Sequence, residues 1–346
     1  MPSVAPSKPS LSTEEVTAGL QRLCRDRTKD RAARVTDLRP VGGHAGLTLG
    51  FNVHWTPNGR TTREEALIVR LAPPGVRVAG PADVVLQARL LRCLGKLGVP
   101  VPRVRWCGSE NRYFGTPFHV VELVQGRTYP LDAPDGTRGM GDVHAVGRDV
   151  IRRLAELHRL HPACVASVLA EPLDLQADIE RWDRFVERAG DPELVVDIPD
   201  LRAKLRARMP RAPRIGILHG DFQWSNVLVA DEQVVAILDW ELAAVGPLLT
   251  DLGWLCLFSD PECWKSPIEL PRLPSPMELV SEYASHSGDD VDEIDWYRAH
   301  AAYKFGIIAA LNLGLHLRGR RHDPFWEEVA PSVPQMVRRG IALLDS

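Results

Sequence analysis

Residues 215–252 read IGILHGDFQWSNVLVADEQVVAILDWELAAVGPLLTDL, and three polar side chains stand out in them: Asp221, Asn226 and Asp239. The apolar run 215–218 predicts a short buried strand, and Gly220 permits a sharp turn directly behind it. We therefore expect Asp221 at a strand end, facing a cleft.

Two further apolar runs, 227–230 and 234–238, flank a turn-like segment and predict an antiparallel hairpin. A hairpin returns the chain to its start, so Asn226 and Asp239 are expected side by side. A carboxylate beside an amide carbonyl suits Mg²⁺, which binds one or two protein oxygens and takes its other ligands from water and phosphates. Asp221 lies outside this pair and remains available to accept a proton.

This pattern resembles the catalytic core of protein kinases and, more closely, that of the aminoglycoside phosphotransferase family. Protein kinases carry H-R-D-x-x-x-x-N and then a metal-binding Asp; the corresponding strings here are HGDFQWSN and ILDWE. The resemblance implies that Asp221 is the catalytic base and that Asn226 and Asp239 are the metal ligands. It also makes His219 a buried support of the loop and Asp251 the anchor of the loop backbone.

The segment upstream offers the parts that such a fold needs around the phosphates of a nucleotide. A glycine-rich turn contains Gly42, Gly43 and Gly46, whose missing Cβ atoms let backbone N–H groups approach phosphate oxygens. The alternating run 47–55 predicts a half-buried strand, and a second strand is expected at 66–72 after the turn at Pro57-Asn58-Gly59. Arg70 on that second strand is then the expected phosphate-binding cation. The alternative is an edge-strand charge that points to solvent.

A helix is expected from Asp83, with an apolar stripe that ends before Pro100. The stripe consists of Leu86, Leu90, Leu91, Leu94 and Leu97. Gln87 on its edge corresponds to the Glu that holds the strand cation in most kinases. Arginine in place of lysine at the position of Arg70 resembles one branch of the family, the phosphotransferase domains that are fused to some acyl-CoA dehydrogenases. Gln87 is the less expected departure, and whether it reduces activity stays open.

The strand-like run 118–124 corresponds to the hinge between the lobes of a kinase. Backbone groups near Glu122 to Val124 are expected to bond the adenine edge of the nucleotide, which is ATP or GTP.

The resemblance implies an α+β, protein-kinase-like fold with two lobes, a small β-rich one and a larger, mainly helical one. We expect a disordered tail at 1–10, a nucleotide-binding lobe at 11–124 and a catalytic and substrate lobe at 125–346. The nucleotide-binding lobe opens with a capping box at Ser12-Thr13-Glu14-Glu15. A central helix is expected at 146–158, where His158 is a core residue rather than a ligand.

Composition excludes several other classes. The formal net charge of −3 without a basic run argues against a nucleic-acid partner. Six scattered cysteines lack the C-x-x-C spacing of a zinc site and indicate no disulfide framework, which fits a reducing cytoplasm. The start of the chain lacks the apolar core of a signal peptide, and the apolar run 305–317 is too short to span a bilayer, so we expect a core helix there and no membrane partner.

The acceptor is expected between the catalytic loop and the helices after Asp251. Large aromatic residues are candidates for its walls, although such residues are more often core; they are Trp224, Trp254, Trp264 and Tyr303. The acidic run 289–295 suggests a site for polycationic aminoglycosides, but acids in that position more often mark a helix start.

The sequence thus predicts an ATP- and Mg²⁺-dependent kinase that phosphorylates a hydroxyl of a small molecule. The acceptor stays open between antibiotics such as macrolides or aminoglycosides, amino alcohols, sugars and hydroxyacyl thioesters, and the oligomeric state stays open too. Two rival classes remain: a nucleotide-binding pseudokinase, which the Arg70 and Gln87 departures favour, and a metal-dependent hydrolase that uses the same carboxylates.

Overall fold

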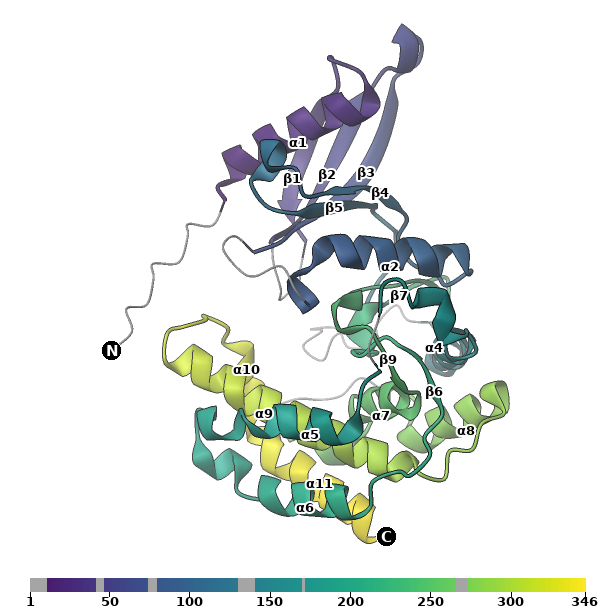
Figure 1. Ribbon diagram of the computed structural model, residues 1–346, viewed down its shortest axis with the longest axis vertical. Coiled ribbons are helices and arrows are strands. Elements are labelled where there is room, and N and C mark those ends of the chain that lie inside the picture. The colour runs from purple at the N-terminus through teal and green to yellow at the C-terminus, as the bar shows by residue number, and fades with distance from the viewer. Residues whose placement is uncertain (1–10, 42–46, 74–79, 130–140, 170–171, 266–272) are drawn as a thin grey trace. The chain divides into compact units, whose positions relative to one another are not determined.

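A computed structural model describes residues 11–41, 47–73, 80–129, 141–169, 172–265 and 273–346 (Figure 1). The chain divides into two compact units. The N-terminal unit runs to Gln125 and includes the later segment Leu238–Leu242, whereas the C-terminal unit comprises Gly126–Ile237 and Ala243–Ser346. The segment 238–242, which contains Asp239, therefore belongs to the N-terminal unit.

The N-terminal unit is built on an antiparallel sheet with the strand order β1-β2-β3-β5-β4. The strands are β1 Arg34–Pro40, β2 Leu47–Trp55, β3 Arg63–Leu71, β4 Val104–Gly108 and β5 Phe118–Glu122. The strands expected at 47–55, 66–72 and 118–124 are thus confirmed, although β3 begins three residues earlier and β5 ends two residues earlier than expected. Because β3 lies between β2 and β5, the edge-strand alternative for Arg70 is wrong.

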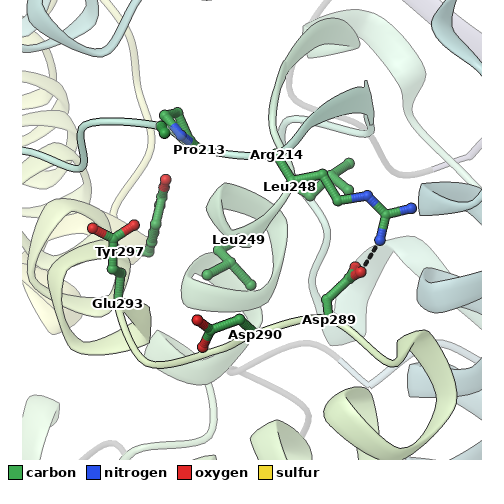
Figure 2. Close-up of a pocket in the computed structure, with 9 residues that line it drawn as sticks. Pro213, Arg214, Leu248, Leu249, Asp289, Asp290, Glu293 and Tyr297 are labelled. Atoms are coloured by element: carbon green, nitrogen blue, oxygen red, sulfur yellow. Dashed lines mark hydrogen bonds and ion pairs between the residues drawn. The ribbon is translucent and has the colours of Figure 1, made fainter.

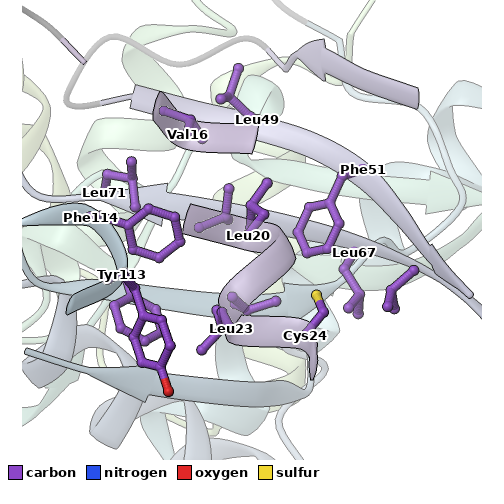
Figure 3. Packing of buried hydrophobic residues seen from close by; sticks show 14 residues of the cluster. Val16, Leu20, Leu23, Cys24, Leu49, Phe51, Leu67, Leu71, Tyr113 and Phe114 are labelled. Atoms are coloured by element: carbon purple, nitrogen blue, oxygen red, sulfur yellow. The ribbon is translucent and has the colours of Figure 1, made fainter. Parts of the chain in front are cut away.

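Helix α1, Thr13–Thr28, covers one face of this sheet, and the apolar core of the unit lies between them (Figure 3). The predicted capping box is confirmed, because the Ser12 side chain accepts from the backbone of Glu15 and the Glu15 side chain accepts from the backbone of Ser12. The core joins Leu20 and Leu23 of α1 to the alternate strand residues that face them. The short helix α3, Asn111–Phe114, adds Tyr113 and Phe114 to this core.

Helix α2, Val84–Lys96, lies on the opposite face. Its first carbonyl, of Val84, is 2.7 Å from Nδ1 of His119 on β5, and His119 is paired directly with Arg70 on β3. Paired residues of neighbouring strands project from the same face, so Arg70 lies on the face that α2 covers. The predicted helix start is confirmed, because the Asp83 side chain caps the N–H of Leu86. Leu97 is an error in the predicted stripe: it follows the last helical residue and is 38% exposed.

The C-terminal unit is mainly helical, with two small antiparallel pairs of strands, β6 with β9 and β7 with β8. Its helices are α4 Val143–His158, α5 Leu175–Asp183, α6 Ile198–Ala207, α7 Leu249–Leu257, α8 Pro276–Ser287, α9 Ile294–Leu317, α10 Phe325–Val329 and α11 Val333–Asp345. Its strands are β6 Ile215–Leu218, β7 Val227–Ala230, β8 Gln233–Ile237 and β9 Ala244–Pro247. The expected strands at 215–218 and 227–230 are confirmed, although Ile215 is exposed rather than buried.

The hairpin of β7 and β8 has a two-residue turn at Asp231 and Glu232, and both residues have positive φ angles, 48° and 61°. Two left-handed residues give the turn the twist that a tight hairpin needs. Gln233 therefore begins the second strand instead of belonging to the turn, which moves that strand one residue earlier than predicted.

Two predicted helices form the core of this unit. In α4 the residues Ile151, Leu154, Leu157 and His158 are all buried, as expected. The apolar run 305–317 is the second half of the 24-residue helix α9, most of whose residues are buried. No helix within the described ranges combines the length and apolar character that a membrane span requires.

Candidate active site

The candidate base Asp221 lies on the loop that follows β6. Gly220 turns the chain there with a φ of 84°, which supports the predicted sharp turn. The partly buried Asp221 carboxylate accepts three side-chain hydrogen bonds. Oδ1 accepts from Nε2 of Gln223 at 2.8 Å and from Nε1 of Trp254 at 2.7 Å, and Oδ2 accepts from Nδ2 of Asn226 at 2.8 Å. The carboxylate is therefore held in one orientation.

The loop backbone is fixed by Asp251, which is fully buried on α7. Its two oxygens accept from the backbone N–H groups of His219 at 2.7 Å and Gly220 at 2.8 Å. Nδ1 of the buried His219 ring in turn accepts from the N–H of Asp221 at 3.2 Å. These contacts match the anchoring role predicted for Asp251 and the supporting role predicted for His219.

Asp251 remains ionised in its buried position. Burial alone would raise its pKa, but the hydrogen bond and charge of His158 and the contacts with His219 outweigh burial, so the pKa lies below its usual range. His158 is 2% exposed, with its Nδ1 at 2.8 Å from the hydroxyl of Tyr283 and its Nε2 at 3.4 Å from Asp251. The prediction that His158 is a core residue is confirmed.

The pKa of Asp221 shifts in the opposite direction. Burial raises it, and the nearby charges of His219 and Lys304 and the hydrogen bonds from Trp254 and Asn226 reduce that increase without cancelling it. A carboxylate with a raised pKa is a stronger base than an ordinary aspartate, which suits it to accept a proton during a reaction.

Asn226 is bound to the base, a contact that the sequence spacing did not predict. Its Nδ2 donates to both the carbonyl oxygen and Oδ2 of Asp221, at 2.9 and 2.8 Å. The amide nitrogen is thereby committed, and Oδ1 of Asn226 is the atom left for another ligand. Asn226 directly precedes β7, where Val227 pairs with Ile237 of β8. Its expected position beside Asp239 stays a prediction.

Arg70 and Asp239, predicted for two different roles, form an ion pair within the N-terminal unit. The Arg70 side chain is only 12% exposed, and its Nη1 is 2.7 Å from Oδ1 of Asp239. Its Nη2 forms a second ion pair with Glu241. Burial alone would lower the pKa of Arg70, but the two carboxylates outweigh burial and raise it. Glu241 was not among the predicted site residues, although its position two residues after Asp239 in ILDWE was a signal.

Of the remaining residues predicted to contact the nucleotide, some are described by the structure and some are not. Gln87 is buried on α2, the helix that covers the face of Arg70. Gly42, Gly43 and Gly46 lie outside the described residues. The N–H of Glu122 donates to Arg103 and that of Leu123 to Ala66, both at 3.0 Å.

Those two hinge donors are therefore already used. The Glu122 carboxylate is also committed, since it accepts from the backbone N–H of Arg103 at 2.9 Å. Val124 follows directly, and within the described residues its N–H has no hydrogen-bond partner. If this segment contacts an adenine edge, Val124 is the N–H donor that it offers.

Three of the four aromatic wall candidates are core residues. Trp224, Trp264 and Tyr303 are at most 5% exposed and donate to Ser259, Leu257 and Ile179. Trp254 differs, because its indole N–H reaches the candidate base.

The acidic run precedes α9, as a helix start would, with Glu293 at the N-cap and Asp295 in the first turn. It also borders a cavity of about 280 Å³ (Figure 2). Asp289 forms an ion pair with Arg214, and Asp290, Glu293 and Tyr297 line the same cavity. Arg214 lies just before β6, whereas Asp221 follows its other end, so this cavity is separate from the loop around the base.

A β-rich unit, a helical unit and a loop with a braced aspartate define a kinase-like protein, and comparisons with known proteins agree. Residues 59–299 match the model of the phosphotransferase enzyme family, so the chain belongs to that family. A candidate aminoglycoside phosphotransferase from Ralstonia eutropha superposes with a TM-score of 0.75 at 19% identity, covering 95% of this chain and 98% of that one. A spectinomycin phosphotransferase gives a TM-score of 0.63 at 12% identity, with coverage of 97% and 99%.

Curated relatives include acyl-CoA dehydrogenase family member 10 of Mus musculus, which is 25% identical over 277 residues. The match covers 74% of this chain but only 25% of that protein, and other relatives are spanned over about a third of their length. The expected kinase-like α+β fold and the membership of a small-molecule phosphotransferase family with hydroxyl acceptors are thereby confirmed. The predicted resemblance to phosphotransferase domains fused to acyl-CoA dehydrogenases is confirmed by these relatives.

Proposed function

We propose that this protein is an ATP- and Mg²⁺-dependent kinase that transfers a phosphoryl group to a hydroxyl of a small molecule, with Asp221 as the general base. The observation that carries the proposal is the Asp221 carboxylate, which three N–H donors orient on a loop whose backbone Asp251 anchors. Orienting the acceptor hydroxyl and receiving its proton is the task of the corresponding aspartate in kinases.

The hydrogen bonds favour one oxygen of Asp221 for this task. A carboxylate oxygen has two lone pairs that accept hydrogen bonds. On Oδ1 both are used, by Gln223 and Trp254, whereas Asn226 is the one donor to Oδ2 among the residues that the structure describes. The acceptor hydroxyl would therefore donate to Oδ2, which would take up the proton as the hydroxyl oxygen bonds to the γ-phosphorus and the bond from that phosphorus to the leaving nucleoside diphosphate breaks.

Asn226 and Asp239 are proposed as the protein ligands of Mg²⁺, because each keeps one oxygen for such a ligand. Oδ1 of Asn226 and Oδ2 of Asp239 have no partner among the described residues, and both are hard oxygen ligands. Nowhere in the described chain do three or more His, Cys, Asp or Glu residues gather as metal ligands, and Mg²⁺ in nucleotide sites needs only one or two protein ligands. When bound, Mg²⁺ would neutralise charge on the nucleotide phosphates.

The charges around Arg70 support a metal–nucleotide complex as the donor. Arg70, Asp239 and Glu241 together carry one net negative charge, because one guanidinium faces two carboxylates. Such a group repels bare phosphate and attracts a divalent cation. Similar structures were solved with ADP and with GDP, so both ATP and GTP are tested as donors.

The test is a screen for nucleoside diphosphate release with Mg²⁺ and a panel of hydroxyl compounds. The panel contains macrolides, aminoglycosides, amino alcohols, sugars and hydroxyacyl thioesters. We expect release that depends on one acceptor class and on Mg²⁺. No release with any acceptor, together with measurable nucleotide binding, would favour the pseudokinase alternative.

Asp221→Asn is the decisive variant. We expect it to lower turnover by about 10²- to 10⁴-fold while leaving nucleotide affinity nearly unchanged, because a positioned general base contributes this much to rate. Asp292→Asn makes the same chemical change at an exposed position before α9 and serves as the matched control. If both variants turned over like the wild type, Asp221 would have no part in the chemistry.

A further inference from the structure

One cation of the C-terminal unit, Lys304, is buried and has no ion pair with any residue that the structure describes. It lies on α9 and is 7% exposed. Its Nζ lies over two indole rings, 4.8 Å from the ring centre of Trp254 and 5.6 Å from that of Trp182 on α5. Within the described residues it forms neither a hydrogen bond nor an ion pair.

Lys304 is adjacent to the candidate base through a single side chain. The indole of Trp254 donates its N–H to Asp221 and turns a ring face to the Lys304 ammonium. The charges of Asp221 and Lys304 act on each other: that of Lys304 lowers the pKa of Asp221, and that of Asp221 raises the pKa of Lys304. Burial nevertheless dominates for Lys304, and its pKa lies below the usual value.

The nearest acid in this cluster already has other partners. Asp178 on α5 is 2.8 Å from Nη2 of Arg181 and 3.3 Å from Nε2 of His300. Its charge acts on Lys304, but the two do not form an ion pair. Among the described residues, Nε1 of Trp182 is also buried without an acceptor, and the two Asp178 oxygens have ion pairs but no hydrogen bond.

A buried ammonium without a partner is unfavourable, since desolvation of such an ion costs several kcal/mol. Cation–π contact with two rings recovers only part of this cost. Among the groups of this cluster without a hydrogen bond, Lys304 and Trp182 are donors, whereas the Asp178 oxygens already face Arg181 and His300. A ligand that would satisfy the two donors carries acceptor oxygens and a negative charge. A buried, perturbed ionisable group beside a candidate base is also a common mark of a binding site.

We propose that Lys304 binds an anionic group of the acceptor, so that the substrate is a hydroxyl compound with a carboxylate or a phosphate. This inference rests on the proposed function, because it assumes that the acceptor hydroxyl lies at Asp221. An anion at Lys304 and a hydroxyl at Asp221 are then held on the two sides of Trp254. An acidic compound is the opposite of a polycationic aminoglycoside in charge.

The test measures binding without nucleotide, so that it does not depend on catalysis. Isothermal calorimetry compares hydroxycarboxylates with their neutral carboxamides and with hydroxyalkyl phosphates. We expect the wild type to bind one anionic series about 10- to 100-fold more tightly than the amides, which is the usual worth of a charge-assisted hydrogen bond. Whether carboxylates or phosphates bind better identifies the anion. A wild type that binds no anion, or that binds acids and amides equally, overturns the proposal.

The variants assign the effect to Lys304. Lys304→Met should abolish the preference for the anion and leave amide binding unchanged, whereas Lys304→Arg should keep part of it. Lys204→Met on α6 removes the same charge from a residue that pairs with Asp345, and it should behave like the wild type. Thermal melting of each variant confirms that it is folded. A preference that persists in folded Lys304→Met contradicts the proposal.

Rates of diphosphate release with the same compounds test the anion site at Lys304 separately from the proposed kinase activity. Lys304→Met should reduce kcat/KM for acids only. An equal loss of kcat with acids and amides would mean that Lys304 contacts the transferred phosphoryl group, and it would overturn the anion site. A wild type that binds the anion selectively but releases no diphosphate would instead contradict the proposed kinase activity and leave the anion site standing.

Discussion

At the scale of single residues, the two aspartates of the candidate site are tuned in opposite directions. Asp251 has a lowered pKa and is a fixed acceptor for two backbone N–H groups, whereas Asp221 has a raised pKa and one oxygen with spare capacity. The first arrangement suits a permanent structural anion and the second suits a group that gains and loses a proton. Separation of pKa values in this way is common where two acids have different tasks.

The raised pKa of Asp221 predicts the pH dependence of catalysis. The base acts in its ionised form, so kcat/KM should fall as pH decreases through a pKa above the ordinary value for aspartate. Trp254→Phe removes an N–H that favours the ionised form, so the acidic limb of the profile should move to higher pH by about one unit.

Trp264→Phe is the control for this prediction. Its indole N–H donates to the carbonyl of Leu257 rather than to the base, while its ring belongs to the same aromatic cluster as that of Trp254. Its profile should keep the wild-type midpoint. Equal midpoints for Trp254→Phe and the wild type would show that this hydrogen bond does not tune the base.

The sequence predicted single residues well where their contacts are local. The turn at Gly220, the cap at Asp83 and the anchoring by Asp251 follow from short spacing or from a motif with a fixed geometry. The ion pair of Arg70 with Asp239 could not be read from spacing, since 169 positions separate the two residues. Nor could the bond from Trp254 to Asp221, because hydrophobicity does not reveal where an indole N–H points.

At the scale of elements, the close packing of α7 against α9 positions the site. Asp251 and Trp254 are on α7, and Lys304 is on α9. Gly253 permits the contact, because a Cβ there would lie 2.6 Å from the backbone carbonyl carbon of Tyr297 on α9. The apolar pattern identified the second half of α9 as a core helix, but it could not indicate which glycine allows two helices to approach.

Gly253→Ala tests this packing. We expect a loss of about 1–3 kcal/mol in the free energy of unfolding, because the added methyl group forces the two helices apart. Turnover should fall too, since the same helix holds Asp251 and Trp254. Chemical denaturation and initial rates measure both effects.

Gly306→Ala on α9 is the matched control. Its Cβ would meet nothing closer than 3.4 Å, an ordinary contact with Val333. Because alanine is the better helix former, stability should stay the same or rise by about 0.5–1 kcal/mol. If both alanines were tolerated equally, the close contact at Gly253 would have no energetic weight.

At the scale of the whole molecule, neither unit is formed by one continuous segment of the chain. The chain passes from the N-terminal to the C-terminal unit after Gln125, returns for Leu238–Leu242 and leaves again. The sequence predicted a single boundary at 124/125, because composition and periodicity show elements but not which distant segment completes a unit. The partners of Arg70, Asp239 and Glu241, come from the returning segment.

The cysteines predict how the folded protein reacts with a thiol reagent. Burial raises the pKa of Cys24 in the N-terminal unit and of Cys256 in the C-terminal unit to about 12, and it raises that of Cys263 as well. Such thiols are protonated and covered, so they should react only as fast as their unit unfolds, whereas the exposed Cys164 should react at once.

Mass spectrometry of labelled peptides measures each site separately. Cys93 and Cys107 are partly exposed and should react at intermediate rates. Cys164→Ser should therefore remove the fastest phase and leave the slow phases of the buried cysteines unchanged. Since Cys24 and Cys256 report on different units, their rates in denaturant also show whether the units unfold together. Rapid modification of Cys256 in the absence of denaturant would contradict the burial described for α7.

The bond between Trp254 and Asp221 also makes the candidate base visible to spectroscopy. An indole whose N–H donates to a carboxylate is sensitive, in its emission and in the resonance of a fluorinated analogue, to the protonation of that carboxylate. The ring face of the same indole contacts the Lys304 ammonium. The chain has nine tryptophans, so the signal of Trp254 is the one that a Trp254→Phe variant lacks. That one indole would record proton uptake at its edge and ion binding at its face, without any label attached to the substrate.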